Sequence, residues 1–422
     1  MYAIGSLRTS LYPQGSRSYR RVMGEIPPNE LGRRLREIRA WRGQSLEVTA
    51  GLAGISYGYL GKLERGDKHV DSRRLLEALA SALRVAPQEL TGQPFVPADP
   101  LTGEAHAAIA AVETALETYD LGEDPGVGVR PWPEVAAGVA NLRGKGDYAA
   151  TGRALPGVLG ELHAYYVRAP ERRREVLVAL IYAYRAAASV TKNLGVRGLP
   201  MMAVRQARDC AQELGEPEWL GFTAYLRGIM GGTGARQRQY ELAVRAAEQL
   251  ASTPGPTAIQ VAGTLHFIAA LACAVQRDAV RTHDHLAEAD DLAQRLPEQH
   301  ENFAGLYFGP NNVSLWRVSL ATELGEGGKV AEYARDAHPA AIPLRDWQAT
   351  FHCDLGRAMT TDRATRAQGV QSLITAEQLA PQYVRNNVLV RETVTGLLPT
   401  AARDHTGREL RGLAHRMGLA PR

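Results

Sequence analysis

One short predicted helix places polar and basic side chains on a single face, and these side chains suit contact with a nucleic acid. Ser56 follows the turn former Gly54 and can cap a helix in which Leu60 and Leu63 point inward. The outward positions are then held by Tyr57, Gly58, Gly61, Lys62 and Arg65. A lysine can donate to a guanine edge, and a tyrosine can contact a thymine methyl or a phosphate. The pattern predicts a helix that lies in the major groove of DNA.

Further basic and hydroxyl residues around this helix could contact phosphates, which adds affinity without sequence information. Residues 1–92 carry 15 Lys and Arg against 9 Asp and Glu, although the whole chain has a net charge of only +4. For each residue alone, a solvated surface charge is an equally good interpretation. The expected phosphate contacts are Arg33, Arg34, Arg42, Ser45, Ser56, Arg65, Lys68 and Arg73.

A compact domain of five short helices over residues 29–92 would position these side chains. Apolar residues recur at helical spacing in the first segment, at Leu31, Leu35, Ile38 and Trp41. Ser45 caps a short second helix, Ser56 a third and Ser72 a fourth, and a last turn follows Pro87. Residues 1–28 show no sustained period and are expected to form a flexible basic arm.

Residues 31–90 resemble the lambda-repressor-like, Cro-type helix-turn-helix regulators (XRE family). The resemblance rests on the first-helix pattern LGxRLRxxR, the turn Ala53-Gly54-Ile55-Ser56, the exit Leu63-Glu64-Arg65-Gly66 and the terminal LAxAL. It implies that Tyr57, Gly58 and Lys62 occupy base-reading positions and that Arg39 and Glu64 form a partly buried ion pair. The chain departs from the family at Leu46, where many relatives carry a DNA-contacting Gln, at Thr49, which replaces a core Leu, and at Gly58, which offers no side chain.

A proline-rich linker at residues 93–102 precedes a region, 103–422, in which helix pairs repeat. The first helices are predicted to begin near Trp132, Glu171, Pro217, Thr257, Pro310, Pro343 and Gln382. Most of these spacings are about 34 to 44 residues, the period of helix-hairpin solenoids. The sequence therefore predicts an all-α chain, with a five-helix lambda-repressor-like domain followed by an α-solenoid that resembles tetratricopeptide repeats.

The layout of a helix-turn-helix domain followed by such repeats is similar to peptide-pheromone-sensing regulators of the RRNPP type and to actinobacterial regulators. That similarity implies a peptide or small-molecule effector in the concave groove of the solenoid. Candidate groove residues follow from polarity alone, because an amide can clamp a peptide backbone and a guanidinium can hold a carboxylate. They are Tyr182, Arg185, Trp219, His266, Asn311, Asn312, Trp316, Arg345, Arg385 and Asn386. Helix capping by the two adjacent Asn, and core packing by the two Trp, are the competing interpretations.

Other classes of function find little support in the sequence. The pair His283 and His285 has no matching third ligand, so no metal or other cofactor is expected. No nucleophile can be paired with a base, and an enzyme is not expected. The three cysteines lie far apart, and no apolar run is expected to reach the roughly 18 residues of a membrane span.

We therefore expect a cytoplasmic, homodimeric regulator that binds double-stranded DNA and an effector, with no membrane partner. The dimer is expected because one short helix reads few base pairs. The alternative is a DNA-located scaffold whose repeats recruit or sequester a partner protein. An enzyme domain fused to a regulator is a third and weaker hypothesis.

Overall fold

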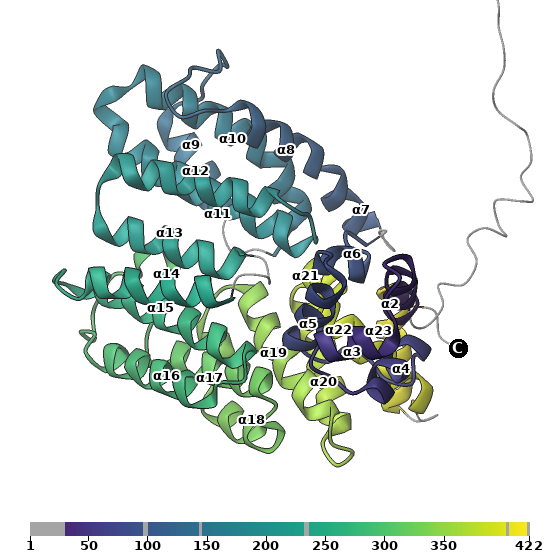
Figure 1. The fold of residues 1–422 in the computed structure, drawn as a ribbon. Coiled ribbons are helices and arrows are strands. Elements are labelled where there is room, and N and C mark those ends of the chain that lie inside the picture. The colour runs from purple at the N-terminus through teal and green to yellow at the C-terminus, as the bar shows by residue number, and fades with distance from the viewer. Residues whose placement is uncertain (1–29, 96–99, 143–145, 232–235, 402–404, 420–422) are drawn as a thin grey trace, which may run out of the picture.

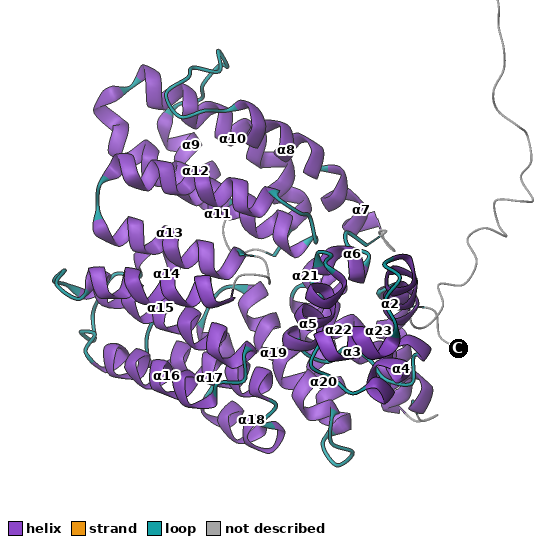
Figure 2. Cartoon of the chain, viewed as in Figure 1, coloured by secondary structure: helices purple, strands orange, loops and turns teal. Residues whose placement is uncertain are grey.

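The computed structural model describes residues 30–95, 100–142, 146–231, 236–401 and 405–419, and within these ranges the chain forms helices and loops without strands (Figure 2). The expected arm at residues 1–28 and residues 96–99 of the expected linker lie outside the described residues. The last three residues of that linker, 100–102, belong to a helix. The all-α prediction is confirmed.

Five helices form an N-terminal bundle, as the sequence predicted: α2 (Glu30–Trp41), α3 (Leu46–Leu52), α4 (Tyr57–Arg65), α5 (Arg73–Leu83) and α6 (Pro87–Thr91). Leu35, Leu60 and Leu79 are fully buried at its centre. Thr49 is also buried. Its hydroxyl donates to Gln44 Oε1 at 2.9 Å, so its polar group is satisfied. A hydroxyl therefore replaces a core leucine without leaving an unpaired donor.

Trp41 shares the helical spacing of Leu31 and Leu35 but does not lie in the core of the bundle. Trp41 is the last residue of α2, and 79% of its surface is exposed. The chain turns away directly after it, so no following helix covers the ring. The guanidinium of Arg42 lies 5.3 Å from the centre of the indole.

Stacked helix pairs make up the rest of the chain, which we call the repeat domain (Figure 1). Their first helices begin within two residues of the predicted positions, and proline in the first turn marks several starts because that position needs no backbone N–H. The first helices are α9 (Trp132–Asn141), α11 (Arg173–Asn193), α13 (Pro217–Met230), α15 (Pro256–Val275), α17 (Pro310–Leu324), α19 (Arg345–Thr360) and α21 (Pro381–Asn386).

Second helices alternate with these first helices along the stack. They are α10 (Tyr148–Arg168), α12 (Leu199–Leu214), α14 (Arg236–Leu250), α16 (Ala279–Gln294), α18 (Gly327–Tyr333), α20 (Arg366–Leu379) and α22 (Val388–Leu397). Three further helices were not predicted from the sequence: α7 (Pro100–Ala107), α8 (Ile109–Thr118) and α23 (His405–Arg416). Asp147 and Asp278 cap α10 and α16 by accepting from backbone N–H groups at 3.0 Å.

Helix α15 runs through the main core of the repeat domain. It is 20 residues long and apolar enough to cross a membrane, so the expectation that no run reaches this length was wrong. In the structure, 83% of its apolar window is buried against other helices, as in the core helix of a stack. Gly263 allows the close approach of a neighbour, because a Cβ there would lie 1.9 Å from Cζ of Phe308.

Candidate nucleic-acid interface and interdomain cavity

Helices α3 and α4 are held at a fixed turn by two serine caps. Ser45 Oγ accepts from the N–H of Val48 at 3.1 Å, and Ser56 Oγ accepts from the N–H of Tyr59 at 3.2 Å. Between the two helices, Gly54 has φ +64°, a backbone conformation that favours glycine. Gly66 ends α4 with φ +80°. The chain thus builds a short helix, a tight turn and a second short helix.

The outward face of α4 is open to solvent. Tyr57 is 60% exposed, and Gly58, Lys62 and Arg65 are also exposed. Leu60 and Leu63 lie in the bundle core, as predicted, but Gly61 is buried beside them, so its predicted outward position was wrong. The three residues expected to read bases therefore share one accessible surface.

An ion pair braces α4 against α2. Arg39 Nε donates to Glu64 Oε1 at 2.6 Å, and Nη2 donates to Oε2 at 2.9 Å. The side chains are only 14% and 6% exposed, and the hydrogen bond that Arg39 donates to Glu64 raises the pKa of Arg39. The predicted pair is confirmed, and it holds α4 against α2.

Exposed apolar side chains accompany this surface, and the sequence analysis did not single them out. Val48 and Leu52 lie one turn apart on α3 and are 52% and 62% exposed, close in sequence to Trp41 and Tyr57. Their spacing of four residues was visible in the sequence, but α3 was too short for its buried face to be assigned.

The residues predicted to contact phosphate are not all on the surface of the bundle. Those on the surface of the bundle are Arg33, Arg42, Ser45, Ser56, Arg65 and Lys68, while Arg34 is half-buried beside Glu30 and Gly92. The phosphate contact predicted for Arg73 was wrong. Arg73 turns toward the repeat domain, where its Nη1 donates to Glu323 Oε1 at 2.7 Å, so it is not available to a DNA backbone at the α4 face.

Helix α5 of the bundle packs onto the repeat domain through charged pairs. Besides Arg73 with Glu323, Glu77 accepts from Arg236 Nη2 at 2.7 Å, and both of these side chains are 13% exposed. Burial raises the pKa of Glu77 despite the hydrogen bond from Arg236. The backbone carbonyl of Asp71 accepts from Arg357 Nη2 at 3.0 Å. The bundle is thus joined to α14, α17 and α19.

The C-terminal helices hold the other side of the same junction. The N–H of Val70 donates to Glu392 Oε2 at 3.4 Å, and Gln93 Nε2 donates to the carbonyl of Asn386 at 3.2 Å. Val388 of α22 packs against the core of the bundle. In Figure 1 the bundle accordingly lies beside the yellow-green helices α20 to α23.

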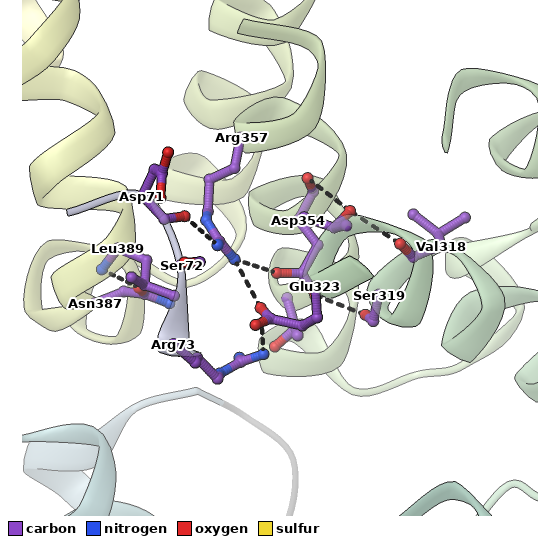
Figure 3. Close-up of polar contacts among 12 residues, drawn as sticks. Asp71, Ser72, Arg73, Val318, Ser319, Glu323, Asp354, Arg357, Asn387 and Leu389 are labelled. Carbon is purple, nitrogen blue, oxygen red and sulfur yellow. Dashed lines mark hydrogen bonds and ion pairs between the residues drawn. The ribbon is translucent and has the colours of Figure 1, made fainter. Parts of the chain in front are cut away.

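A buried charged cluster, formed by Arg73, Glu323, Arg357 and Asp354, lies at this junction (Figure 3). Arg357 Nη1 donates to Asp354 Oδ1 at 3.1 Å and lies 3.5 Å from Glu323 Oε1. Ser319 donates to Asp354 Oδ2 at 2.6 Å. Burial acts to raise the pKa of Glu323, but the two arginines outweigh it and hold the pKa below its ordinary value.

Next to this cluster is a cavity of about 260 Å³ between the first helices of the repeats. Arg73 from α5 forms part of its wall, so the cavity is bounded by both the bundle and the repeat domain. Aromatic and polar residues form much of the rest, including Tyr148, Tyr182, Arg185, Lys192, Tyr225, Asn312, Trp316, Asp346, Trp347 and Tyr383.

Lys192 is a basic residue of the cavity wall whose pKa is strongly lowered. Its side chain remains accessible to solvent, although protein atoms surround it within the cavity. This desolvation, together with the charges of Arg73 and Arg236, lowers the pKa of Lys192 to about 7. At another part of the wall, burial raises the pKa of Asp346 against the attraction of Arg185.

Of the predicted groove residues, Tyr182, Arg185, Asn312 and Trp316 line the cavity. The others do not. Trp219 is a core residue, with its ring centre 4.7 Å from that of Phe303. His266 lies against His285, with 3.1 Å between their Nδ1 atoms, and burial lowers the pKa of His266 to about 4.

The remaining predicted groove residues serve local structure. Asn311 pairs with the backbone of His338, and Asn386 donates to the carbonyl of Gln382. Arg385 pairs with Glu377, and Arg345 is exposed at the start of α19. These positions were expected in the groove because they are polar and lie on first helices, but polarity there is also what helix ends require.

Cavity residues that the sequence analysis missed include Arg73, Lys192, Asp346 and Trp347. They come from three helices that are far apart in the chain, so no local spacing connects them. Among the described residues, no group of three His, Cys, Asp or Glu could hold a metal ion.

A second hollow, of about 1320 Å³, lies between α12, α13 and α14, on the side of α13 that does not face the cavity. Five arginines line it: Arg205, Arg208, Arg227, Arg238 and Arg245. Burial, followed by the charges of three of the others, lowers the pKa of Arg227. Asp209 is the acidic residue in the same wall. We call this hollow the arginine groove.

Comparison with protein families gives one match: residues 30–91 fit the model of a helix-turn-helix domain. This range coincides with α2 to α6, and it supports a helix-turn-helix DNA-binding domain at the place where the exposed α4 face lies. Comparisons with curated proteins and with solved structures give no match for the chain.

Proposed function

We propose that the chain is a cytoplasmic, sequence-specific transcriptional regulator of the XRE type whose repeat domain binds an effector and thereby modulates operator binding. It has no catalytic role in this proposal. One observation carries it: the bundle leaves its α4 face open while its α5 closes a cavity of the repeat domain. A ligand in that cavity would contact the DNA-binding domain itself.

Several features support this combination of roles. The exposed tyrosine and lysine of α4 can reach base edges, and the basic residues around them can contact phosphates. We propose that a homodimer supplies the second recognition helix, because one short helix contacts few base pairs. An effector that binds one arrangement of the two domains more tightly would shift the population toward that arrangement.

DNA binding can be tested by gel shift with the promoter region of the chain's own gene, over a range of salt concentrations. We expect binding that weakens as salt rises and that a Tyr57→Ala, Lys62→Ala double variant loses. Arg363 is exposed on the repeat domain, so Arg363→Ala is the matched control and should bind as the wild type does. Undiminished binding by the double variant would contradict the assigned recognition face.

The second candidate function is a DNA-located scaffold that recruits a partner protein, and the arginine groove favours it. The groove is larger than the cavity, and it combines its arginines with apolar residues such as Leu220, which is 38% exposed. This chemistry suits an acidic, amphipathic segment of a protein. Native mass spectrometry of the purified protein separates the two functions, because a bound small molecule or peptide supports sensing and a stoichiometric protein supports a scaffold.

A further inference from the structure

We infer that the effector is a small molecule with an anionic group, and that Lys192 and Arg73 hold this group in the interdomain cavity. The inference rests on the proposed effector-sensing function and assigns its ligand a chemical class. A carboxylate and a phosphate are both compatible with these donors, and the experiment below includes one of each.

The size of the cavity favours a small molecule over an extended peptide. Its volume of about 260 Å³ is close to the lower end of the range for small-molecule pockets, ~300 to 1,000 Å³. Tyr182, Tyr225, Trp316 and Trp347 give the wall flat aromatic surfaces. A compact ligand with a ring or an apolar body therefore fits this space.

The balance of charge beside α5 favours an anion. Lys192 Nζ donates to the backbone carbonyl of Ile229, and it forms no ion pair with a carboxylate in the described part of the chain. The two arginines that repel it, Arg73 and Arg236, are already engaged by Glu323 and Glu77. With Arg357 and Asp354 of the same cluster included, four cations meet three carboxylates here, and a bound anion would neutralise the surplus charge.

Another part of the cavity wall contains a buried polar atom that a ligand could satisfy. Asn312 lines the cavity and is 2% exposed, and its Oδ1 has no hydrogen-bond partner among the described residues. Its Nδ2 donates to the carbonyls of Leu306 and Tyr307, so the oxygen is the part left for a donor. Buried polar atoms are usually paired. The ligand is therefore expected to carry a hydrogen-bond donor in addition to its anionic group.

Binding of an anion at this place would compete with Glu323 for Arg73. The Arg73 to Glu323 pair is one of the contacts that join α5 to the repeat domain, so weakening it would loosen the bundle from α17. The ligand thereby reaches the DNA-binding domain through one side chain, with no relay through other residues.

The test uses the full-length protein and four aromatic probes of similar size: benzoate, phenyl phosphate, benzamide and benzylamine. Isothermal titration calorimetry gives each affinity for the wild type and for the variants Lys192→Met and Glu323→Gln. Lys329→Met is the matched control, because Lys329 is an exposed lysine on α18 that does not line the cavity.

We expect at least one anionic probe to bind the wild type about tenfold or more tightly than benzamide or benzylamine. Lys192→Met should reduce that affinity about tenfold, whereas Lys329→Met should leave it unchanged. Glu323→Gln should increase it several-fold, since it removes the competitor for Arg73. Three results would each overturn the inference. They are equal binding of the anionic probes and of benzamide or benzylamine, equal binding by Lys192→Met and the wild type, and no binding by any probe.

Gel shifts with the same proteins separate this inference from the proposed function. If benzamide or benzylamine, rather than an anion, binds and changes the affinity for DNA, effector sensing stands and the anionic class is wrong. If the anionic probes bind as expected while the protein has no salt-sensitive affinity for DNA, the ligand site stands and the regulatory function is wrong.

Discussion

Two faces of the N-terminal bundle, the exposed α4 face and the α5 face at the junction with the repeat domain, use charge in opposite ways. On α4, Lys62 and Arg65 are exposed, where a phosphate or a base edge can replace solvent. On α5, Arg73 and Glu77 each form an ion pair with the repeat domain. The comparison teaches that a basic residue near a helix-turn-helix is not by itself a DNA contact, because the same residue type also builds the junction between domains.

The largest expected effect concerns the buried cluster on the α5 side. Arg357→Met would leave Asp354 without a cationic partner and Glu323 with Arg73 alone, and breaking a buried pair typically costs ~3–5 kcal/mol. Urea unfolding of the full chain should show a loss of this size. Arg363→Met, on an exposed residue of the same region, should change stability by less than ~0.5 kcal/mol. Similar losses in both variants would show that the cluster contributes nothing specific.

The second largest effect concerns DNA binding by two lysines on or near the α4 face, Lys62 and Lys68. Lys62→Ala should reduce affinity for the specific promoter site by ~1–3 kcal/mol, because it removes a base contact. Lys68→Ala should weaken binding to specific and unrelated duplexes equally, as expected of a phosphate contact. Fluorescence anisotropy with both DNAs gives the two affinities. A loss of equal size on both DNAs after Lys62→Ala would make Lys62 a phosphate contact instead.

The third prediction concerns the pH dependence of anion binding in the cavity. With its pKa at about 7, Lys192 loses its proton above that pH in the free protein. A bound anion raises this pKa, so the complex holds more protons and the affinity must fall as the pH rises above about 7. Benzoate, which stays ionised, should bind with constant affinity below pH 7 and up to about tenfold more weakly per pH unit above it.

The control for this pH dependence is Lys192→Met, in which the slope should vanish. The other charged groups at this end of the cavity are Arg73, Arg236, Arg357, Glu77, Glu323 and Asp354, and the three arginines stay protonated throughout the range. A slope that persists in Lys192→Met would assign the proton to another group.

The smallest effects come from the two matched serine caps. Ser56 Oγ caps α4, and Ser72 Oγ accepts from the N–H of Leu75 at 3.4 Å and caps α5. Either serine replaced by alanine should lower stability by ~1 kcal/mol. DNA affinity at fixed temperature should fall with Ser56→Ala, whereas Ser72→Ala should affect mainly stability. A fall in DNA affinity of equal size in both variants would contradict a separation of the two faces.

Local patterns were sufficient to predict the bundle and the helix pairs. The serine caps, the positive-φ glycine at 54 and the prolines at helix starts act within a few residues, so they can be seen in the sequence. The Arg39 to Glu64 pair was available through the family resemblance. The outward position of Trp41 was not predicted, because helical spacing alone does not show at which residue the neighbouring helices stop burying the apolar face.

The cavity could not be predicted in the same way, because its key residues meet only after the stack has formed. Arg73 and Glu323 are 250 positions apart, and the sequence around each is ordinary for an amphipathic helix. Arg73 was expected to contact phosphate for this reason. Tyr182, Arg185, Asn312 and Trp316 were found because they are polar or aromatic on first helices, which line the inner side of the stack.

The contact between Val70 and Glu392 spans 322 positions, and it has a consequence for synthesis on the ribosome. The bundle emerges early, while α22, whose Val388 covers part of the bundle core, emerges near the end. A nascent or prematurely terminated chain therefore presents its recognition helix before Glu392 and Val388 contact this side of the bundle. Translation through α22 adds these contacts to the ones that α14, α17 and α19 make with the bundle, and so completes the junction last.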